Sequence, residues 1–450
     1  MYNVLLCVTE GNANMKYFLA VDIGASSGRH IVGWNDKGEI MTDEVYRFKN
    51  GVTSIDGSLC WDIDSIFAEV VNGIKAALAK YPQIESMSID TWAVDYMLLQ
   101  NDEPIYPCCA YRDERTSLAI KAVHEIIPFE QLYSRTGIQF QPFNTVYQLY
   151  ADKISGKING ATDFLMIPEY LIWRLTGVKI KEYTNATSTG LVNAESGEFD
   201  SEIIDKLGLP KELFGKVYPP KTKVGAFLPE ISEKVGGNID VVLCPTHDTA
   251  SAVEGIPMSD DSPFLSSGTW SLLGAKINKP ITSDDSRKAN FTNEGGVGYI
   301  RYLKNIMGLW IVQCLQKQMN ISFGEMVELA KTSSYDKLFD VNAERFRAPT
   351  DMRAEIADEL GGSLSDADIL NSVYRSLAYS YSVAVNELET LVGKQYDKLY
   401  IAGGGAKNTY LNELTERFTN KQVIALPIEA TALGNLKSQM QSAGEFAAEI

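Results

Sequence analysis

The sequence predicts an α/β fold built from two related halves. Strand-like apolar runs alternate with helix-like patterns along the 450 residues, as in sheets covered by helices. An apolar run at 17–22 leads through a turn of small residues to a second strand-like run at 31–34. Segment 264–274 repeats this order of strand, small-residue turn and strand. Because one motif occurs twice in one chain, we expect a duplicated fold with two hairpins that face phosphate groups.

The composition excludes several classes of protein. Hydrophobic residues make up 45% and charged residues 22%, which is typical of a globular chain, and the length suggests two or three domains. With 41 basic and 58 acidic residues the formal net charge is −17, so the average field repels nucleic acids and acidic membranes. No apolar run reaches the ~18–20 residues of a membrane span. We therefore expect neither nucleic acid nor membrane as a partner, although a local pocket can still bind a small anion.

The cysteines and histidines indicate a reducing environment and no zinc centre. Six cysteines are spread over the chain without a C-x-x-C pair, and there are three histidines. This pattern favours free thiols in the cytoplasm over disulfides or a Cys/His metal site. The apolar residues 4–8 lack a basic flank and are followed by Glu10, which is untypical of a secretion signal. Residues 1–14, before Met15, are interpreted as an N-terminal extension.

Local patterns predict the elements of the first half. The turn at 35–38 makes residues 17–47 a hairpin of strands. Segment 63–81 has apolar residues at about every third or fourth position, which is typical of a helix, and segment 84–99 returns to strand-like chemistry. The remaining expectations are helices at 117–127 and 163–176 (the latter stopped by Gly177), a polar loop at 183–190, connecting structure at 200–230 and a strand at 241–244.

The second half is expected to begin near residue 254. A helix-like stretch at 250–254 precedes glycine and proline breakers, which predicts a domain boundary there. We therefore divide the chain into two domains, at 15–253 and 254–450. Near the end, the order strand, glycine turn and helix is typical of nucleotide sites, although the G-x-G-x-x-G spacing is absent; these elements are expected at 396–402, 403–406 and 409–420.

The turn between the first two strands is a candidate phosphate site. Small side chains there let backbone amides and hydroxyls approach phosphate oxygens, and Arg29 can pair with a phosphate group. Asp22 can hold Mg²⁺ through water, since this ion keeps most of its hydration. The alternative is a plain hairpin turn in which Asp22 accepts nearby amides. The sequence contains no G-x-x-x-x-G-K-[ST] loop.

The second hairpin and the late glycine turn carry weaker signals. Segment 266–271 places hydroxyl side chains and Gly268 at a turn, which suits phosphate contact but is common in turns of other proteins. The glycines at 403–405 permit close approach of a base or a ribose to the backbone. Asn408 is either the cap of the next helix or an adenine ligand.

The segment around Asp248 is the candidate catalytic centre. The apolar strand at 241–244 delivers it to the start of a helix. In one interpretation, Asp248 or Thr249 caps that helix. In the other, Asp248 is a catalytic base at the mouth of a cleft between the halves, and the helix N-terminus keeps its carboxylate ionised. His247 and Thr249 then donate hydrogen bonds to, or accept them from, sugar hydroxyls.

Several other polar and aromatic residues allow two interpretations. Asn305 and Gln313 are ordinary helix residues unless a cleft lies beside them. Trp92 is interpreted as packing, whereas Asp90 and Asp95 are either a buried network or ligands.

Taken in order, these motifs resemble those of the FGGY carbohydrate kinases over residues 16–440. The likeness is greatest to the branch of that family that phosphorylates L-rhamnulose. The motifs of the whole family are 22–29, 267–271 and 403–406. The stretches that resemble the branch are 90–92, 111–113, 137–140, 142–145, 182–193, 247–253, 292–296 and 304–310.

The resemblance implies an actin-like, ribonuclease H-like duplicated fold with ATP and sugar in the cleft between two domains. It implies transfer of a phosphoryl group from ATP, with Mg²⁺, to the 1-hydroxyl of L-rhamnulose, and Asp248 as the proton acceptor. The residues implied to contact ATP are Ala25, Ser26, Ser27, Gly28, Arg29, Thr269, Gln313 and Gly404. The residues implied to hold the sugar are Ala93, His247, Asp248, Thr249 and Asn305. Ala93 departs from the family pattern, which has glycine there, so its methyl group can crowd the sugar.

Two alternatives stay open at this point. A kinase of the same family can act on another ketose or polyol, such as L-fuculose, L-xylulose or glycerol. An actin-like protein can instead use its ATPase as a switch for assembly. The His247-Asp248-Thr249 trio favours a small polar acceptor over the switch, and a dinucleotide-dependent dehydrogenase lacks its fingerprint loop.

Overall fold

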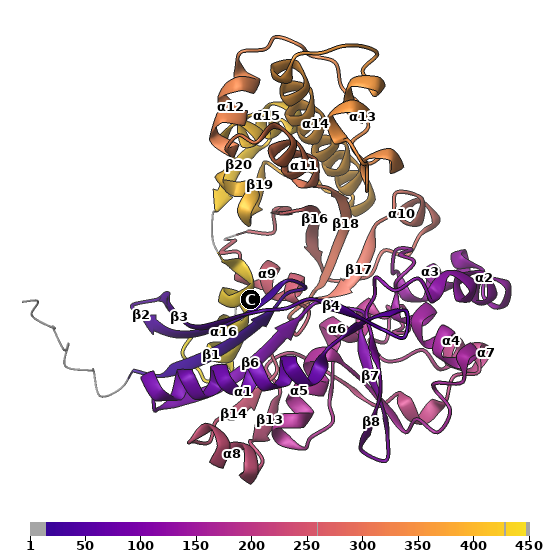
Figure 1. The fold of residues 1–450 in the computed structure, drawn as a ribbon, viewed down its shortest axis with the longest axis vertical. Coiled ribbons are helices and arrows are strands. Elements are labelled where there is room, and N and C mark those ends of the chain that lie inside the picture. The colour runs from indigo at the N-terminus through magenta and orange to yellow at the C-terminus, as the bar shows by residue number, and fades with distance from the viewer. Residues whose placement is uncertain (1–14, 259, 427–428, 447–450) are drawn as a thin grey trace, which may run out of the picture.

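Two α/β lobes make up the computed structural model, which describes residues 15–258, 260–426 and 429–446 (Figure 1). The first lobe contains a six-stranded sheet of order β13-β14-β6-β1-β2-β3. The second contains a six-stranded sheet of order β17-β18-β16-β15-β19-β20. The predicted N-terminal extension at 1–14 lies outside the described residues.

Each lobe repeats the same strand plan, which confirms the predicted duplication. In the first sheet, β1 pairs antiparallel with β2 and parallel with β6. In the second, β15 pairs antiparallel with β16 and parallel with β19. The strands of the first sheet are β1 (Tyr17–Ile23), β2 (Ser27–Asp36), β3 (Glu39–Lys49), β6 (Ile84–Thr91), β13 (Lys223–Ala226) and β14 (Asp240–Val242). The strands of the second are β15 (Phe264–Ser267), β16 (Trp270–Ile277), β17 (Thr292–Gly295), β18 (Ile300–Met307), β19 (Lys398–Ala402) and β20 (Gln422–Leu426).

Smaller sheets extend the first lobe beside its main sheet. Their strands form the groups β4-β5-β9, β10-β7-β8 and β11-β12. These strands are β4 (Val52–Ile55), β5 (Ser58–Trp61), β7 (Tyr96–Gln100), β8 (Glu103–Ile105), β9 (Cys108–Cys109), β10 (Asp163–Met166), β11 (Lys181–Glu182) and β12 (Val217–Tyr218).

One long amphipathic helix anchors the core of each lobe. In α1 (Ile63–Lys80), the side chains at 66, 70 and 74 share a face and are buried against the first sheet. The N-cap Asp62 accepts the amide of Ser65 and starts this helix where the periodicity predicts it. In α14 (Asp366–Val392), an apolar face packs on the second sheet, and Gly393 ends the helix in the left-handed conformation.

The remaining helices cover the sheets and build the smaller regions. In the first lobe they are α2 (Thr116–Ile126), α3 (Phe129–Thr136), α4 (Thr145–Ser155), α5 (Ile167–Thr176), α6 (Tyr183–Ser188), α7 (Ser201–Leu207), η1 (Lys211–Leu213), α8 (Pro229–Val235) and α9 (Asp248–Gly255). Further along the chain they are α10 (Asp284–Lys288), α11 (Trp310–Met319), α12 (Phe323–Lys331), η2 (Glu344–Phe346), α13 (Met352–Glu359), η3 (Gly404–Lys407), α15 (Thr409–Thr419) and α16 (Ala430–Ser442).

Several predicted elements were wrong in type or extent. Residues 163–166 pair with β7 as β10, so the predicted helix at 163–176 is reduced to α5. The predicted polar loop at 183–190 contains α6, because the Glu182 carboxylate accepts the amides of Thr184 and Asn185 and so starts a helix of small polar residues. Local composition does not indicate a helix whose cap is a buried glutamate.

Two further expectations need correction. The connecting structure predicted at 200–230 includes α7, and α8 begins at its end. Asn305 lies on β18, not in a helix. Helix α7 is started by the Asp200 side chain, which accepts two backbone amides, and Asn305 is held in β18 by its pairing with Leu272 of β16.

The last helix returns to the first lobe. Helix α16 lies across α9 and packs against β1 and β6 (Figure 1). Its crossing with α9 is very close: a Cβ atom on Gly434 would lie 1.8 Å from the carbonyl oxygen of Ser251. The chain end thus supports the helix that begins with Asp248. The predicted division into 15–253 and 254–450 stays a prediction.

The structure was searched for membrane-spanning helices and for disulfides over residues 15–258, 260–426 and 429–446. Within them no helix is both long enough and apolar enough to span a membrane. Their cysteines are free, and four of the five are buried.

Candidate active site

A pocket of about 590 Å³ lies between the two lobes. All five predicted sugar-binding residues line it, although they come from three separate parts of the chain. They are Ala93, His247, Asp248, Thr249 and Asn305. The predicted cleft position of Asp248 is therefore confirmed, because Trp270, Leu272 and Asn305 of the second lobe line the same pocket.

Backbone pairing fixes the approach to Asp248. The amide of Thr91, at the end of β6, donates to the carbonyl oxygen of Thr246 at 2.9 Å, and Thr91 forms a parallel bridge with His247. The amide and hydroxyl of Thr246 both donate to the buried carboxylate of Glu182, at 3.1 and 2.7 Å. Asp248 is then the first residue of α9. Two elements from distant parts of the chain hold the segment that carries it.

The capping interpretation of this segment is wrong. The N-cap of α9 is His247, and its side chain makes no capping hydrogen bond. Neither Asp248 nor Thr249 occupies the cap position. The Asp248 side chain is 28% exposed and lines the pocket.

The surroundings of Asp248 oppose the expected effect of the helix N-terminus on its charge. Removal from bulk water, followed by the negative charge of Asp22, raises the pKa of Asp248 to about 7. The amide of Thr249 and the charge of Arg301 lower this pKa but do not offset the increase. Asp248 thus becomes a stronger base than an ordinary aspartate.

Ala93 occupies a tight bend after β6. Val94, the next residue, has φ of 66°, in the left-handed region that β-branched residues rarely adopt. The buried Asp95 holds the bend by accepting the indole N–H groups of Trp61 at 2.7 Å and Trp92 at 2.9 Å. The network interpretation of Asp95 is therefore confirmed. Trp92 packs in the core as predicted, and it also lines the pocket.

Asp90 also belongs to a buried network. It is fully buried, and its carboxylate accepts the side-chain amide of Asn435 on α16 at 2.6 Å. Burial, with a further contribution from Asp22, raises the pKa of Asp90 well above its usual value. Asp90 thus ties α16 to the sheet beneath the pocket.

Three site residues escaped the sequence interpretation. Arg301 is completely buried, and it contacts His247 and Thr249. Gln139 and Asn144 line the pocket, and among the described residues nothing bonds their side-chain oxygens. Strand 300–307 also contains Lys304 and Asn305, so no local signal in the sequence singles out Arg301.

The first hairpin forms a tight turn of small residues. The amide of Gly24 donates to the carbonyl oxygen of Ser27 at 2.9 Å, and the Asn50 side chain donates to the carbonyl oxygen of Gly24 at 2.8 Å. Arg29 faces Asp22 across the strand pair and donates to its Oδ2 from two nitrogens, at 2.8 and 2.9 Å. The contacts of residues 25–29 with ATP stay a prediction.

The other predicted nucleotide residues lie in the second lobe. The Thr269 hydroxyl donates to the side-chain oxygen of Gln313 at 3.3 Å. Gly404 follows β19, which is paired with the strand that leads to Thr269. In this turn a Cβ atom on Gly405 would lie 1.9 Å from the Ser267 hydroxyl oxygen, so the close approach requires glycine. The predicted nucleotide residues are thus divided between the lobes, on the two hairpins and the late glycine turn.

Asn408 resolves one open alternative. Its side-chain oxygen accepts the amide of Leu411 at 3.0 Å and caps α15. The capping interpretation is therefore confirmed.

The carboxylates near the pocket fit a cation that arrives with phosphate groups. The described residues include no cluster of three or more His, Cys, Asp or Glu side chains that could hold a metal ion. The negative charge of Asp22 nevertheless acts on Asp248. Mg²⁺ usually binds one or two carboxylates plus substrate phosphate oxygens, with several waters. This donor set is compatible with such binding.

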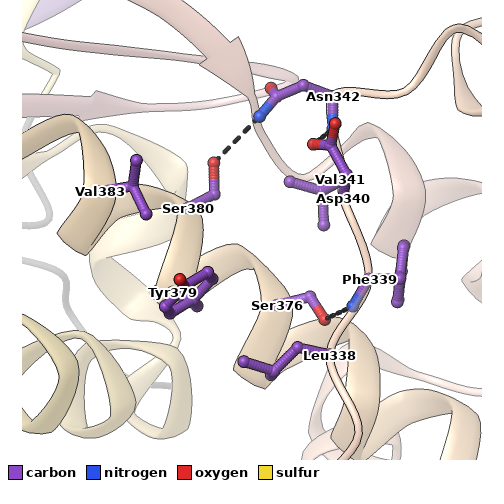
Figure 2. Close-up of a pocket in the computed structure, with 9 residues that line it drawn as sticks. All are labelled: Leu338, Phe339, Asp340, Val341, Asn342, Ser376, Tyr379, Ser380 and Val383. Atoms are coloured by element: carbon purple, nitrogen blue, oxygen red, sulfur yellow. Dashed lines mark hydrogen bonds between the residues drawn. The ribbon is translucent and has the colours of Figure 1, made fainter.

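A second hollow of about 350 Å³ lies elsewhere in the second lobe. Figure 2 shows segment 338–342 facing α14, with the Asn342 side chain donating to the Ser380 hydroxyl at 3.1 Å. Over the residues that the structure describes, its lining includes no predicted site residue. Through Asn342, Ser380 and Val383 it adjoins a further hollow, which reaches Trp270 and Asn305 of the pocket between the lobes.

Comparison with known proteins gives one family for both halves. Residues 17–255 match the N-terminal domain of the FGGY family of carbohydrate kinases, and residues 264–443 match its C-terminal domain. A protein named rhamnulokinase from Oceanobacillus iheyensis is 44% identical over 435 residues, which cover 94% of this chain and 93% of that protein. A protein of the same name from Bacillus subtilis is 37% identical over 445 residues, covering 95% and 90%.

Solved structures share the fold at low sequence identity. A gluconate kinase from Lactobacillus acidophilus superposes with a TM-score of 0.80 at 17% identity, covering 96% of this chain and 90% of that one. Glycerol kinase from Plasmodium falciparum, solved with ADP, gives a TM-score of 0.79 at 15% identity, covering 96% and 91%. These likenesses concern the fold alone.

Proposed function

The chain belongs to the FGGY family of carbohydrate kinases, and from this membership we propose that it transfers a phosphoryl group from ATP to the 1-hydroxyl of L-rhamnulose. The products are L-rhamnulose 1-phosphate and ADP. The observation that carries the proposal is the meeting of Asp248, His247 and Thr249 with Asn305 in one pocket between the lobes. The choice of L-rhamnulose is supported by relatives of that activity's name along nearly the whole chain.

In the proposed reaction Asp248 is the proton acceptor. The sugar oxygen forms a bond to the γ-phosphorus while the bond from that phosphorus to the β–γ bridging oxygen breaks, and the hydroxyl proton passes to Asp248. Phosphoryl transfer depends on positioning and charge stabilisation more than on covalent catalysis. The raised pKa of Asp248 suits it to accept a proton near neutral pH.

The hairpins are proposed to hold the phosphates from both sides. The residues around Arg29 and Thr269 provide amides, hydroxyls and one positive charge. Mg²⁺, bound near Asp22 through water, would neutralise charge on the phosphate oxygens. Approach of the lobes would exclude water and so suppress hydrolysis of ATP.

The pH dependence should report Asp248. Because the base must be unprotonated, kcat/KM for the sugar should fall as the pH is lowered through about 7, approaching tenfold per pH unit. An aspartate of ordinary pKa would keep activity down to about pH 4. A profile that stays flat from pH 8 to pH 5 would contradict the assignment of this pKa.

Arg29→Ala should weaken the binding of ATP more than the binding of the sugar. The guanidinium is bonded to Asp22 and Glu429, and a hydrogen bond to a charged group contributes about 1.5–3 kcal/mol. We expect KM for ATP to rise about 10- to 100-fold, with a much smaller change for the sugar. Arg47→Ala is the matched control, because Arg47 pairs with Arg29 across β2 and β3 but is exposed and bonded to Glu44. Unchanged ATP affinity in Arg29→Ala would remove Arg29 from the nucleotide site.

The substrate is tested with a panel of acceptors. A coupled assay with ATP and Mg²⁺ should give the highest kcat/KM with L-rhamnulose, compared with L-fuculose, L-xylulose and glycerol. A different preferred sugar would leave the kinase assignment standing but overturn the assignment of L-rhamnulose. The comparison is needed because the methyl group of Ala93 can crowd the sugar. Sugar-independent ATPase with polymerisation, seen by light scattering, would favour the actin-like switch.

The cytoplasm is the proposed location. Its support is that the cysteines of the described ranges are free thiols, as expected in a reducing compartment.

A further inference from the structure

Arg301 is buried behind His247 and Thr249, two residues that line the pocket between the lobes. Its side chain has no exposed surface, which is rare for arginine unless its charge is compensated. Nε donates to the carbonyl oxygen of Gly295 at 2.7 Å, and Nη2 donates to Glu294 at 3.0 Å. The remaining contacts join Arg301 to His247 and Thr249.

We infer that Arg301 fixes His247 in the tautomer that carries its proton on Nε2, and thereby makes the Thr249 hydroxyl a hydrogen-bond donor to the substrate. The first part concerns the protein alone. The second part rests on the proposed function, since it assigns a role toward the sugar. Arg301 is therefore a positioning residue, which acts through His247 and Thr249.

The tautomer follows from the chemistry of the guanidinium. Nη2 of Arg301 lies 3.2 Å from Nδ1 of His247. A guanidinium has donors and no acceptor, so Nδ1 must offer its lone pair and cannot carry a proton. The proton of a neutral imidazole is then on Nε2, which lies 2.9 Å from the Thr249 hydroxyl oxygen. His247 thus donates to Thr249.

The direction of the Thr249 hydroxyl follows in turn. Its oxygen receives one hydrogen bond from Nη1 of Arg301 at 2.8 Å and one from His247 at 2.9 Å. A hydroxyl has two acceptor lone pairs and one donor hydrogen, so both lone pairs are occupied. The hydrogen remains for a group in the pocket that Thr249 lines. The substrate atom facing Thr249 must therefore be an acceptor oxygen.

The charges around His247 set what would happen without Arg301. Glu294 on β17 lies 3.4 Å from Nδ1, and Asp248 on α9 lies 3.6 Å from Nε2. Glu182, at the end of β11, accepts the neighbouring amide of Thr246. At these distances the carboxylates of Glu294 and Asp248 favour a protonated imidazole.

Arg301 opposes that protonation. Burial, followed by the positive charge of Arg301, lowers the pKa of His247 well below its usual value. A neutral His247 matters to the base, because an imidazolium beside Asp248 would lower the pKa of that carboxyl. Arg301 therefore sets both a hydrogen-bond direction and the charge next to Asp248.

The first test uses the whole, ligand-free wild-type enzyme. ¹⁵N NMR of labelled imidazoles from pH 5.5 to 8 should show Nδ1 of His247 unprotonated and Nε2 protonated, with no titration. Since the chain has three histidines, a His247→Gln spectrum assigns the signal, and His124, which lies nearer the surface, serves as the comparison. A protonated Nδ1, or a His247 signal that titrates in this range, would overturn the inference. This result does not depend on which sugar is phosphorylated.

The second test uses Arg301→Lys, which keeps the positive charge. One ammonium group cannot replace the fork that bonds Thr249, His247 and Glu294 together. We expect the His247 proton to be shared between Nδ1 and Nε2 in this variant, because the directed donor to Nδ1 is lost. The sugar KM should rise at least tenfold, with KM for ATP nearly unchanged. If the folded variant keeps the wild-type His247 signal, Arg301 does not fix the tautomer. Should this variant not fold, the wild-type spectrum still decides.

The third test concerns the donor itself. Thr249→Val keeps the shape and removes the hydroxyl, so the sugar KM should rise about tenfold or more, as expected for loss of a buried hydrogen bond of about 1.5 kcal/mol. Thr249→Ser should stay within about threefold of wild type, because it keeps the O–H group. A Thr249→Val enzyme with wild-type sugar KM would overturn the donor role. Absence of kinase activity in the wild type would instead refute the proposed function and leave the NMR result standing.

Discussion

Asp248→Asn is expected to lower kcat by about 10²–10⁴-fold, the usual contribution of general acid–base catalysis, with the fold retained. Asparagine has nearly the same shape but cannot accept the proton of the sugar hydroxyl. The backbone bonds that hold the segment, from Thr91 and Thr246, do not involve this side chain. Steady-state kinetics with saturating ATP and sugar, with circular dichroism for the fold, measures the effect.

Asp240→Asn provides the matched control. Asp240 is exposed at the start of β14, the strand that precedes the catalytic segment. Its substitution should leave kcat unchanged. Near-wild-type turnover in purified Asp248→Asn would place the base elsewhere, with Glu294, a carboxylate that also lines the pocket, as the next to test.

The second large effect is expected on stability, from Gly434→Ala in α16. In most helix interiors glycine is less favourable than alanine by about 0.8–1 kcal/mol, so this change normally stabilises a helix. Here the added Cβ would lie 1.8 Å from the carbonyl oxygen of Ser251 and 2.8 Å from the amide nitrogen of Gly255. Both contacts are backbone atoms, which cannot rotate away. We expect a loss of about 1–3 kcal/mol or more, as in overpacked cores.

The crossing of α16 and α9 links this stability effect to activity. Helix α9 begins with Asp248 and ends at Gly255, so separating the two helices should also displace the catalytic carboxylate. We therefore expect a lower urea midpoint together with reduced kcat.

Gly362→Ala is the control for the glycine substitution itself. No described atom lies within 4 Å of a Cβ at Gly362, so its urea midpoint should stay close to wild type. If Gly434→Ala were as stable as wild type, the close crossing would not be a constraint in solution.

Local sequence was sufficient for the repeated strand plan and for much of the site. The two hairpins, helices α1 and α15 and the position of Asp248 at a helix start follow from apolar periodicity and from turn residues. The motif resemblance then predicted that Ala93, His247, Thr249 and Asn305 bind the sugar. The fold brings all four to one pocket. These signals are local because each depends on neighbours within a few residues.

The sequence could not indicate properties that depend on distant partners. Helix α6 is started by a buried glutamate. Arg301 can be identified as a site residue only from its contact with α9, which the sequence of its own strand does not indicate. The raised pKa of Asp248 could not be read from the sequence for the same reason. The helix start is visible in the sequence, whereas burial in the cleft and the charge of Asp22 are not.

The sequence by itself thus determined the two hairpins and helices α1 and α15, the repetition of the strand plan, and which carboxylate is placed at the junction. The tertiary structure decided the protonation of that carboxylate, the hydrogen-bond direction around His247 and the return of α16 to the first lobe. The physical reason is the distance along the chain over which each interaction acts. Periodicity and turn chemistry act between neighbours in the chain, whereas solvation, charge and close packing depend on atoms that only the completed fold brings together.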